Sequence, residues 1–131
     1  MKSYTNLEQS KKLAEILPLE SADMHYSRVK DEEYDWIPLL SPIPKLCAEY
    51  IDNIPCWSLS ALLEQLDYEV VDEEGESYYL NIEKCEGNTY YMYYETSGHF
   101  DDWRIETDTY DYLIDACVEM ILKLKKRIYY E

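Results

Sequence analysis

Two stretches of the chain carry apolar residues at the spacing of an α-helix. The longer one covers residues 110–129 and contains no Gly or Pro. Its apolar positions recur every three or four residues, as on one buried face of a helix. They are Leu113, Ile114, Cys117, Met120, Ile121, Leu124 and Ile128. The shorter stretch, residues 6–17, has the same spacing and ends at Pro18, which cannot continue a helix. The pattern predicts one helix near each end.

Capping signals mark the start of two helices. Thr5 and Glu8 have the spacing of a capping box, in which Thr5 accepts a hydrogen bond from the amide of Glu8 and Glu8 reaches back. Ser58 is the expected N-cap of a short central helix over residues 59–66, with Trp57 packing onto its first turn.

Shorter alternating runs predict β-strands between the helices. Residues 22–29 and 34–40 are expected to form two strands around a polar loop, and Pro38 places the second strand at a sheet edge because it lacks an N–H donor. An irregular, proline-rich connection follows, in which residues 45–51 are expected to make a helical turn or two.

The clearest strand signal is a hairpin of residues 78–85 and 89–96. Gly87 and Asn88 between them tolerate the left-handed backbone conformations that a tight turn requires. Alternation should point three apolar residues of the first strand to the core: Tyr78, Leu80 and Ile82. Shorter strands are expected at two further places, residues 68–71 and 103–105.

Together these elements predict an α+β fold, with an antiparallel sheet of about four to six strands packed against an N-terminal helix, a short central helix and a long C-terminal helix. A length of 131 residues favours a single domain over residues 1–131.

Charge narrows the possible partners. The chain has 28 acidic and 12 basic residues, a formal net charge of −16. This field repels phosphate backbones and anionic lipids, so we expect neither direct nucleic-acid binding nor membrane binding, and it favours a partner protein with a basic surface. The alternative is that the charge only keeps the protein soluble. The N-terminus resembles no export signal and no apolar run is long enough to span a membrane, so a cytoplasmic location is expected.

Residue types that carry catalysis or bind metals are scarce. Four cysteines could form two disulfides, but in the absence of an export signal we expect free thiols in a reducing cytosol. They form no C-x-x-C pair, so we expect no zinc site. The chain has no phosphate-binding glycine loop, calcium loop or serine nucleophile motif. His25 lies within a predicted strand. His99 lies beside Asp101 and Asp102 in a predicted loop, which is either a functional loop or a solvated acidic turn. We therefore predict no catalytic residue, cofactor or metal.

Tyrosine is the unusual residue, with 15 copies against one Phe. Tyrosines build sheets through cross-strand pairs, and they are also enriched in protein-binding surfaces. If Tyr79, Tyr91 and Tyr93, or the alternate set on the other face, lie exposed together, they form an aromatic platform amid negative charge. The candidate partner-binding residues are Tyr79, Tyr91, Tyr93, His99, Asp101, Asp102 and Trp103.

Three regions of the chain resemble a known family. They are residues 6–18 with 21–24, residues 55–59, and residues 113–117 with 119–124. These strings are similar to those of small, acidic, uncharacterised proteins of gut Bacteroides and their prophages or mobile elements. The resemblance implies a cytoplasmic origin and no particular activity.

Three functions follow as hypotheses. The first is a non-enzymatic acidic domain that binds a partner protein, in its sharpest form an inhibitor or a DNA mimic whose ordered carboxylates imitate the phosphates of DNA. The second is a small ligand-binding domain or enzyme with a pocket near His99, Trp103 and the tyrosine-rich hairpin. The third is an accessory domain of a mobile element. Neither the partner nor the oligomeric state follows from the sequence.

Overall fold

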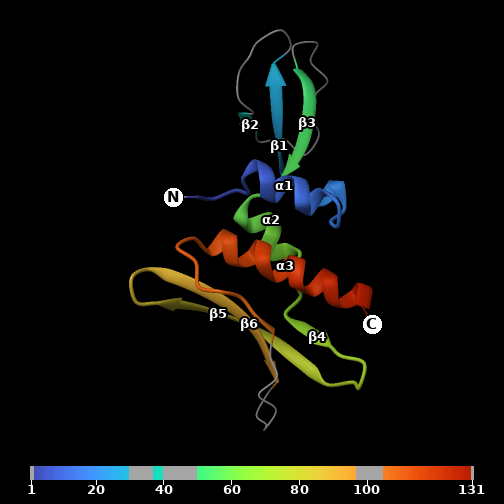
Figure 1. Ribbon diagram of the computed structural model, residues 1–131, viewed down its shortest axis with the longest axis vertical. Helices are drawn as coiled ribbons and strands as arrows, with labels where there is room; N and C mark the ends of the chain where they lie inside the picture. Colours follow the sequence, from blue (N-terminus) through green and yellow to red (C-terminus); the bar gives the residue numbers. More distant parts are fainter. Residues whose placement is uncertain (1, 30–36, 40–49, 97–104, 131) are drawn as a thin grey trace. The chain divides into compact units, whose positions relative to one another are not determined.

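The computed structural model of the chain describes residues 2–29, 37–39, 50–96 and 105–130. It confirms the α+β class, with N-terminal, central and C-terminal helices and antiparallel sheets (Figure 1). The strands divide between a three-stranded and a four-stranded sheet. The chain forms two compact units, Lys2–Leu62 and Leu63–Glu131, and a single domain stays a prediction. None of the helices within the described ranges has the length and apolar character to cross a membrane.

The sheet of the N-terminal unit has the strand order β2-β1-β3 and is antiparallel throughout. Its strands are β1 (Met24–Val29), β2 (Ile37–Leu39) and β3 (Tyr50–Cys56). Pro38 lies in the edge strand β2, as predicted. His25 is buried in β1, so it has the position of an ordinary strand histidine.

Strand β3 corrects the predicted proline-rich connection. Pro55 pairs with His25 inside this strand, and residues 50 and 51 are extended, not helical. The remainder of the predicted helical turn lies outside the described residues. An edge strand accepts Pro55 because one row of its N–H groups faces no neighbour. Pro55 therefore lies in a strand at the sheet edge.

Helix α1 (Leu7–Ala14) begins one residue later than predicted, because a different pair forms its capping box. The Asn6 side chain accepts a hydrogen bond from the amide of Gln9 at 2.8 Å, and the Gln9 side chain accepts one from the amide of Asn6 at 2.9 Å. Thr5 cannot act as the cap, because its Oγ1 accepts the amide of Trp57 at 3.1 Å and lies 2.7 Å from Ser10 Oγ.

The helix ends at Ala14, before the predicted Leu17, and a short 3-10 helix, η1 (Leu19–Ser21), follows Pro18.

Helix α2 (Leu59–Glu64) begins as predicted at Ser58, whose Oγ accepts the amide of Ala61 at 3.2 Å. Asp23 holds this cap through the amide and the hydroxyl of Ser58. Trp57, immediately before the helix, is fully buried.

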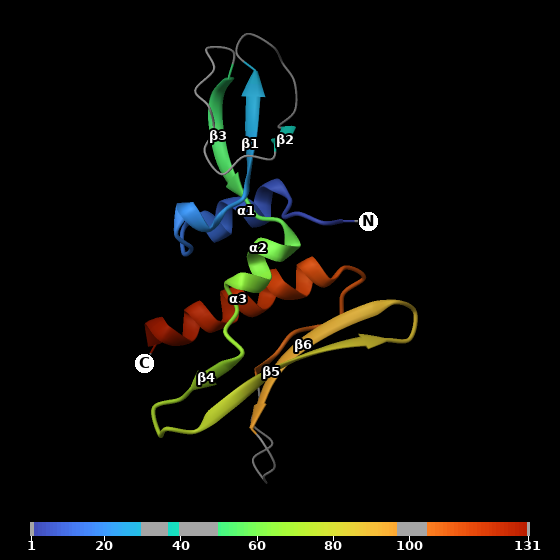
Figure 2. The ribbon, with the colours of Figure 1, turned by 180° about the vertical axis from the view of Figure 1, so that it is seen from behind.

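The C-terminal unit contains an antiparallel sheet in the order β4-β5-β6-β7. Figure 2 labels the first three of these strands. The strands are β4 (Glu69–Val71), β5 (Ser77–Cys85), β6 (Thr89–Thr96) and β7 (Ile105–Glu106). The predicted hairpin is confirmed. Gly87 and Asn88 have φ angles of +79° and +57°, the left-handed conformation that the turn requires.

Helix α3 (Leu113–Tyr130) packs against β6 and β7. It begins three residues later than predicted, because Tyr110 forms a β-bridge in which it exchanges both backbone hydrogen bonds with Tyr90. Four positions of the predicted stripe are buried: Ile114, Cys117, Met120 and Ile121. They share the core of this unit with Met92, Tyr94 and Ile105. Tyr78 is buried as predicted. Ile82, four residues further along β5 and on the same face, is 43% exposed and so departs from the predicted core position.

Candidate interaction surface

The register of the four-stranded sheet gathers tyrosines and glutamates on the face opposite α3. Directly opposed residues of antiparallel strands share a face. Tyr79 opposes both Glu69 and Glu95, Tyr91 opposes Glu83, and Tyr93 opposes Glu106. We call this set the tyrosine–glutamate face: Glu69, Tyr79, Glu83, Tyr91, Tyr93, Glu95 and Glu106.

The centre of the tyrosine–glutamate face is a carboxylate held by two tyrosines. The hydroxyls of Tyr91 and Tyr93 donate to Glu83 Oε2 and Oε1 at 2.7 and 2.8 Å. The two rings are stacked, with their centroids 5.5 Å apart. The strand alternation brings both residues to one side of β6, and the turn at Gly87 sets the register that places Glu83 opposite them. The result is a fixed aromatic and acidic patch.

The hydroxyl of Tyr93 is strongly held in its protonated form. Its hydrogen bond to Glu83, followed by burial and the negative charges of Glu83 and Glu95, raises the pKa of Tyr93 to about 12. A phenol near a carboxylate resists ionisation because the phenolate would place a second negative charge beside the first. Tyr93 therefore stays a neutral donor over the physiological range of pH.

A second aromatic pair lies at the β4 end of the same face. The rings of Tyr68 and Tyr79 have centroids 5.4 Å apart. Tyr68 is 69% exposed and Val71 is 60% exposed. Large apolar side chains at this exposure are available for contact with another molecule.

Charge is unevenly distributed along the chain. Residues 63–122 include 17 acidic and two basic side chains, whereas residues 123–127 include four basic ones. The glutamates of the tyrosine–glutamate face are all exposed. The sequence that builds the sheet is therefore strongly negative, and the basic residues of this unit are concentrated near the end of α3.

The structure brings together three of the seven predicted candidates. Tyr79, Tyr91 and Tyr93 share one face, and Tyr93 is the most buried of the three, with 8% of its surface exposed. The other four lie outside the described residues: His99, Asp101, Asp102 and Trp103.

The predicted candidates missed Tyr68 and the four glutamates of the face: Glu69, Glu83, Glu95 and Glu106. The hairpin turn would have revealed Glu83, because it fixes the pairing of Glu83 with Tyr91. No comparable signal existed for Tyr68.

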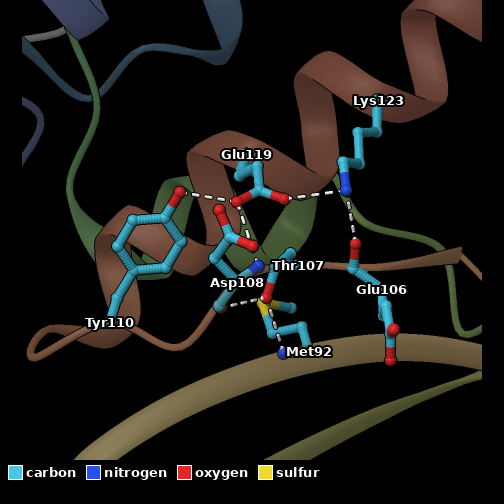
Figure 3. Close-up of polar contacts among 7 residues, drawn as sticks. All are labelled: Met92, Glu106, Thr107, Asp108, Tyr110, Glu119 and Lys123. Atoms are coloured by element: carbon cyan, nitrogen blue, oxygen red, sulfur yellow. Dashed lines mark hydrogen bonds and ion pairs between the residues drawn. The ribbon is translucent and has the colours of Figure 1, made fainter.

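A separate polar network anchors α3 to the strand beneath it (Figure 3). Glu119 Oε1 accepts the Tyr110 hydroxyl at 2.5 Å and the amide of Asp108 at 3.1 Å, and Glu119 Oε2 lies 3.0 Å from Lys123 Nζ. Lys123 also donates to the carbonyl oxygen of Glu106 at 2.6 Å. Glu119 and Lys123 thus form an ion pair between neighbouring turns of α3.

Glu119 is ionised and Tyr110 is neutral in this network. Burial alone would raise the pKa of Glu119, but hydrogen bonds from Tyr110, Asp108 and Lys123 lower it overall. The same bond to Glu119, with burial, raises the pKa of Tyr110. All of these groups are committed to joining α3 to the sheet, so the network has a structural role.

The N-terminal unit has a buried polar cluster around Thr5. The Tyr26 hydroxyl donates to the carbonyl of Thr5 at 2.7 Å, and Cys56 Sγ lies 3.5 Å from the same oxygen. Burial is the main cause that raises the pKa of Cys56, which makes its thiol a poor nucleophile. Burial also raises the pKa of Cys117, to about 12.

The cysteines of the described ranges, Cys56, Cys85 and Cys117, are free. No three histidine, cysteine or acidic side chains of the described ranges are grouped so as to hold a metal ion.

Comparison with known proteins adds no relative, since no protein-family model, curated protein or solved structure matches the chain. The resemblance to small Bacteroides proteins therefore stays a prediction. The surface itself must carry the functional argument.

Proposed function

We propose that the chain is a non-enzymatic interaction domain that binds a partner protein with a basic surface through the tyrosine–glutamate face. The observation that carries this proposal is the convergence of three tyrosines and four exposed glutamates on the face of the sheet opposite α3.

The chemistry of this face suits a basic partner in two ways. Stacked tyrosine rings offer rigid contact area at low entropic cost, and their faces attract the cations of lysine and arginine. The surrounding carboxylates supply acceptors for charge-assisted hydrogen bonds. The negative field of residues 63–122 would also speed the encounter with a positively charged protein.

The proposal is tested by capturing proteins from a lysate of the organism that encodes the chain. A variant that neutralises the face, Glu69→Gln with Glu83→Gln and Glu95→Gln, should retain about tenfold less of the specific partner than the wild type, because it loses the charged acceptors. Retention should be quantified at low and at high ionic strength, since screening weakens such contacts.

A matched control removes the same charge elsewhere. Glu8, Glu15 and Glu20 are exposed residues of the N-terminal unit, and their replacement by Gln should leave capture unchanged. Equal loss from both triple variants would show that only net charge matters, and recovery of no specific partner by the wild type would reject the proposal.

A further inference from the structure

The two edges of the four-stranded sheet differ in the backbone groups that they direct outward. At the β7 edge, the amide of Thr107 donates to the carbonyl of Met92, and the hydroxyl of Thr107 accepts the amide of Met92. The carbonyl of Glu106 belongs to the same peptide unit as the Thr107 amide and therefore points outward, where Lys123 donates to it at 2.6 Å. This hydrogen bond occupies an acceptor that another strand would otherwise use. The β7 edge is also only two residues long.

The β4 edge presents outward-facing backbone groups. Leu80 donates its amide to the carbonyl of Tyr68, and Asp72 donates to the carbonyl of Glu76. In an antiparallel ladder, every second residue directs its backbone N–H and C=O to the neighbouring strand. Tyr68, Val70 and Asp72 therefore direct these groups to β5. Glu69 and Val71, which alternate with them, direct their N–H and C=O away from the sheet.

The side chains along this edge are unusually exposed for apolar residues. Val71 is 60% exposed and Tyr68 is 69% exposed, with its ring against that of Tyr79. Glu69 and Val71 oppose Tyr79 and Ser77 and so lie on the side of the tyrosine–glutamate face, which makes the edge and the face continuous. A strand added at β4 would extend that face directly.

The negative charge around β4 favours one kind of segment as the added strand. Residues 64–76 contain seven acidic side chains and no basic one. A second copy of this chain, pairing edge to edge, would bring two such segments together and would be repelled. An extended segment rich in lysine or arginine has the complementary charge, and its cations can stack on the exposed Tyr68 ring.

We propose that β4 is a strand-addition site for an extended basic segment of the partner protein, paired with the N–H and C=O groups of Glu69 and Val71. This inference rests on the proposed function and adds its binding mode. Backbone pairing supplies affinity for any extended segment, while Tyr68 and Glu69 select those with basic side chains.

The test uses two synthetic peptides of about eight residues that alternate lysine and threonine, one with ordinary amides and one with every backbone nitrogen methylated. Methylation keeps the charge and removes strand pairing. At low ionic strength the ordinary peptide should bind about tenfold or more tightly than the methylated one, because several backbone hydrogen bonds are at stake. NMR hydrogen exchange should show new protection at the amides of Glu69 and Val71 with the ordinary peptide alone.

Two variants isolate the backbone contribution. Val71→Pro removes an outward N–H without removing a bond to β5, and it should abolish the preference for the ordinary peptide. Val71→Thr keeps the N–H and should retain the preference. If Val71→Pro does not fold, the exchange measurement on the wild type decides the matter.

Equal binding of both peptides without protection at Glu69 and Val71 would overturn strand addition. The proposed function would survive that result if the face variant still weakened capture of the partner. Failure of both peptides to bind would also overturn strand addition, and the capture experiment would then judge the proposed function independently.

Discussion

Neighbouring tyrosines on β6 serve the two faces of its sheet in different ways. Tyr94 points to the α3 side, is fully buried, and donates its hydroxyl to the carbonyl of Asp67 at 2.5 Å. Tyr93 points to the opposite side and donates to the carboxylate of Glu83 at 2.8 Å. A buried tyrosine needs a partner for its hydroxyl, and the two faces supply partners of different chemistry.

The difference between these partners indicates that the α3 side of the sheet serves stability, and it supports the proposal that the tyrosine–glutamate face serves recognition. Around Tyr94, apolar side chains of β6, β7 and α3 exclude water, so packing holds the residue in place. Around Tyr93, a charged group holds the hydroxyl, so a change of charge or pH acts there first. The helix side should therefore dominate the free energy of unfolding, and the tyrosine–glutamate face should dominate the response to charge.

The largest expected effect is a loss of stability on the helix side of the sheet, and its absence would contradict the difference between the two faces. Tyr94→Ala should lower the free energy of unfolding by about 3–5 kcal/mol, the usual cost of removing a fully buried aromatic side chain. Tyr91→Ala, on the opposite face, should cost about 1 kcal/mol or less. Urea denaturation followed by circular dichroism measures both. Similar losses for the two variants would mean that both faces are part of one stability core.

Much of the helix side could be predicted from the sequence, because helical and strand periodicities are local signals. The α3 stripe and the hairpin turn both appear as expected. The errors occur where a hydrogen bond to a residue far away in the sequence takes the place of the expected local one. Thr5 is bound to Trp57, so Asn6 caps α1, and Tyr110 is bridged to Tyr90, so α3 begins late. Such long-range hydrogen bonds leave no periodic trace in the sequence.

The candidate surface was only partly predictable for the same reason. Alternation placed Tyr79, Tyr91 and Tyr93 on one face, but only the register shows that Glu83 joins two of them. The partner strands β4 and β7 are only three and two residues long, so their glutamates could not be assigned to this face in advance. The pairing of Tyr68 with Tyr79 depends on the same missing strand register.

An intermediate effect sharpens the comparison through pH. Glu83→Gln should move the pKa of Tyr93 from about 12 toward its ordinary value of 10.0, because the charged acceptor is lost. NMR of tyrosines labelled at the ring carbon next to the hydroxyl can follow the ionisation, with Tyr93→Phe assigning the signal. Glu95→Gln is the control and should produce a smaller shift, since Glu95 acts on Tyr93 only through its charge.

This pKa also gives the sign of a stability change. A phenol whose folded pKa exceeds its unfolded pKa contributes stability at pH values below about 10 that is lost as the pH rises toward about 12. Glu83→Gln brings the folded pKa of Tyr93 back toward the unfolded value, so the fall in stability that Tyr93 contributes between about pH 10 and 12 should shrink. An unchanged titration of Tyr93 in this variant would contradict the assignment of Glu83 as its main partner.

The smallest expected effect measures how much the charged contacts of Lys123 in α3 contribute to the free energy of unfolding. Lys123→Met keeps the aliphatic stem and removes the contacts with Glu119 and the Glu106 carbonyl, which should cost about 0.5–1 kcal/mol, since such partly exposed interactions contribute little. Lys126→Met changes an exposed lysine of the same helix and should be nearly neutral. The difference between the two variants in urea denaturation should shrink at high salt, because screening weakens the ion pair. A loss of several kcal/mol for Lys123→Met alone would mean that this charged anchor, more than the apolar stripe, holds α3 on the sheet.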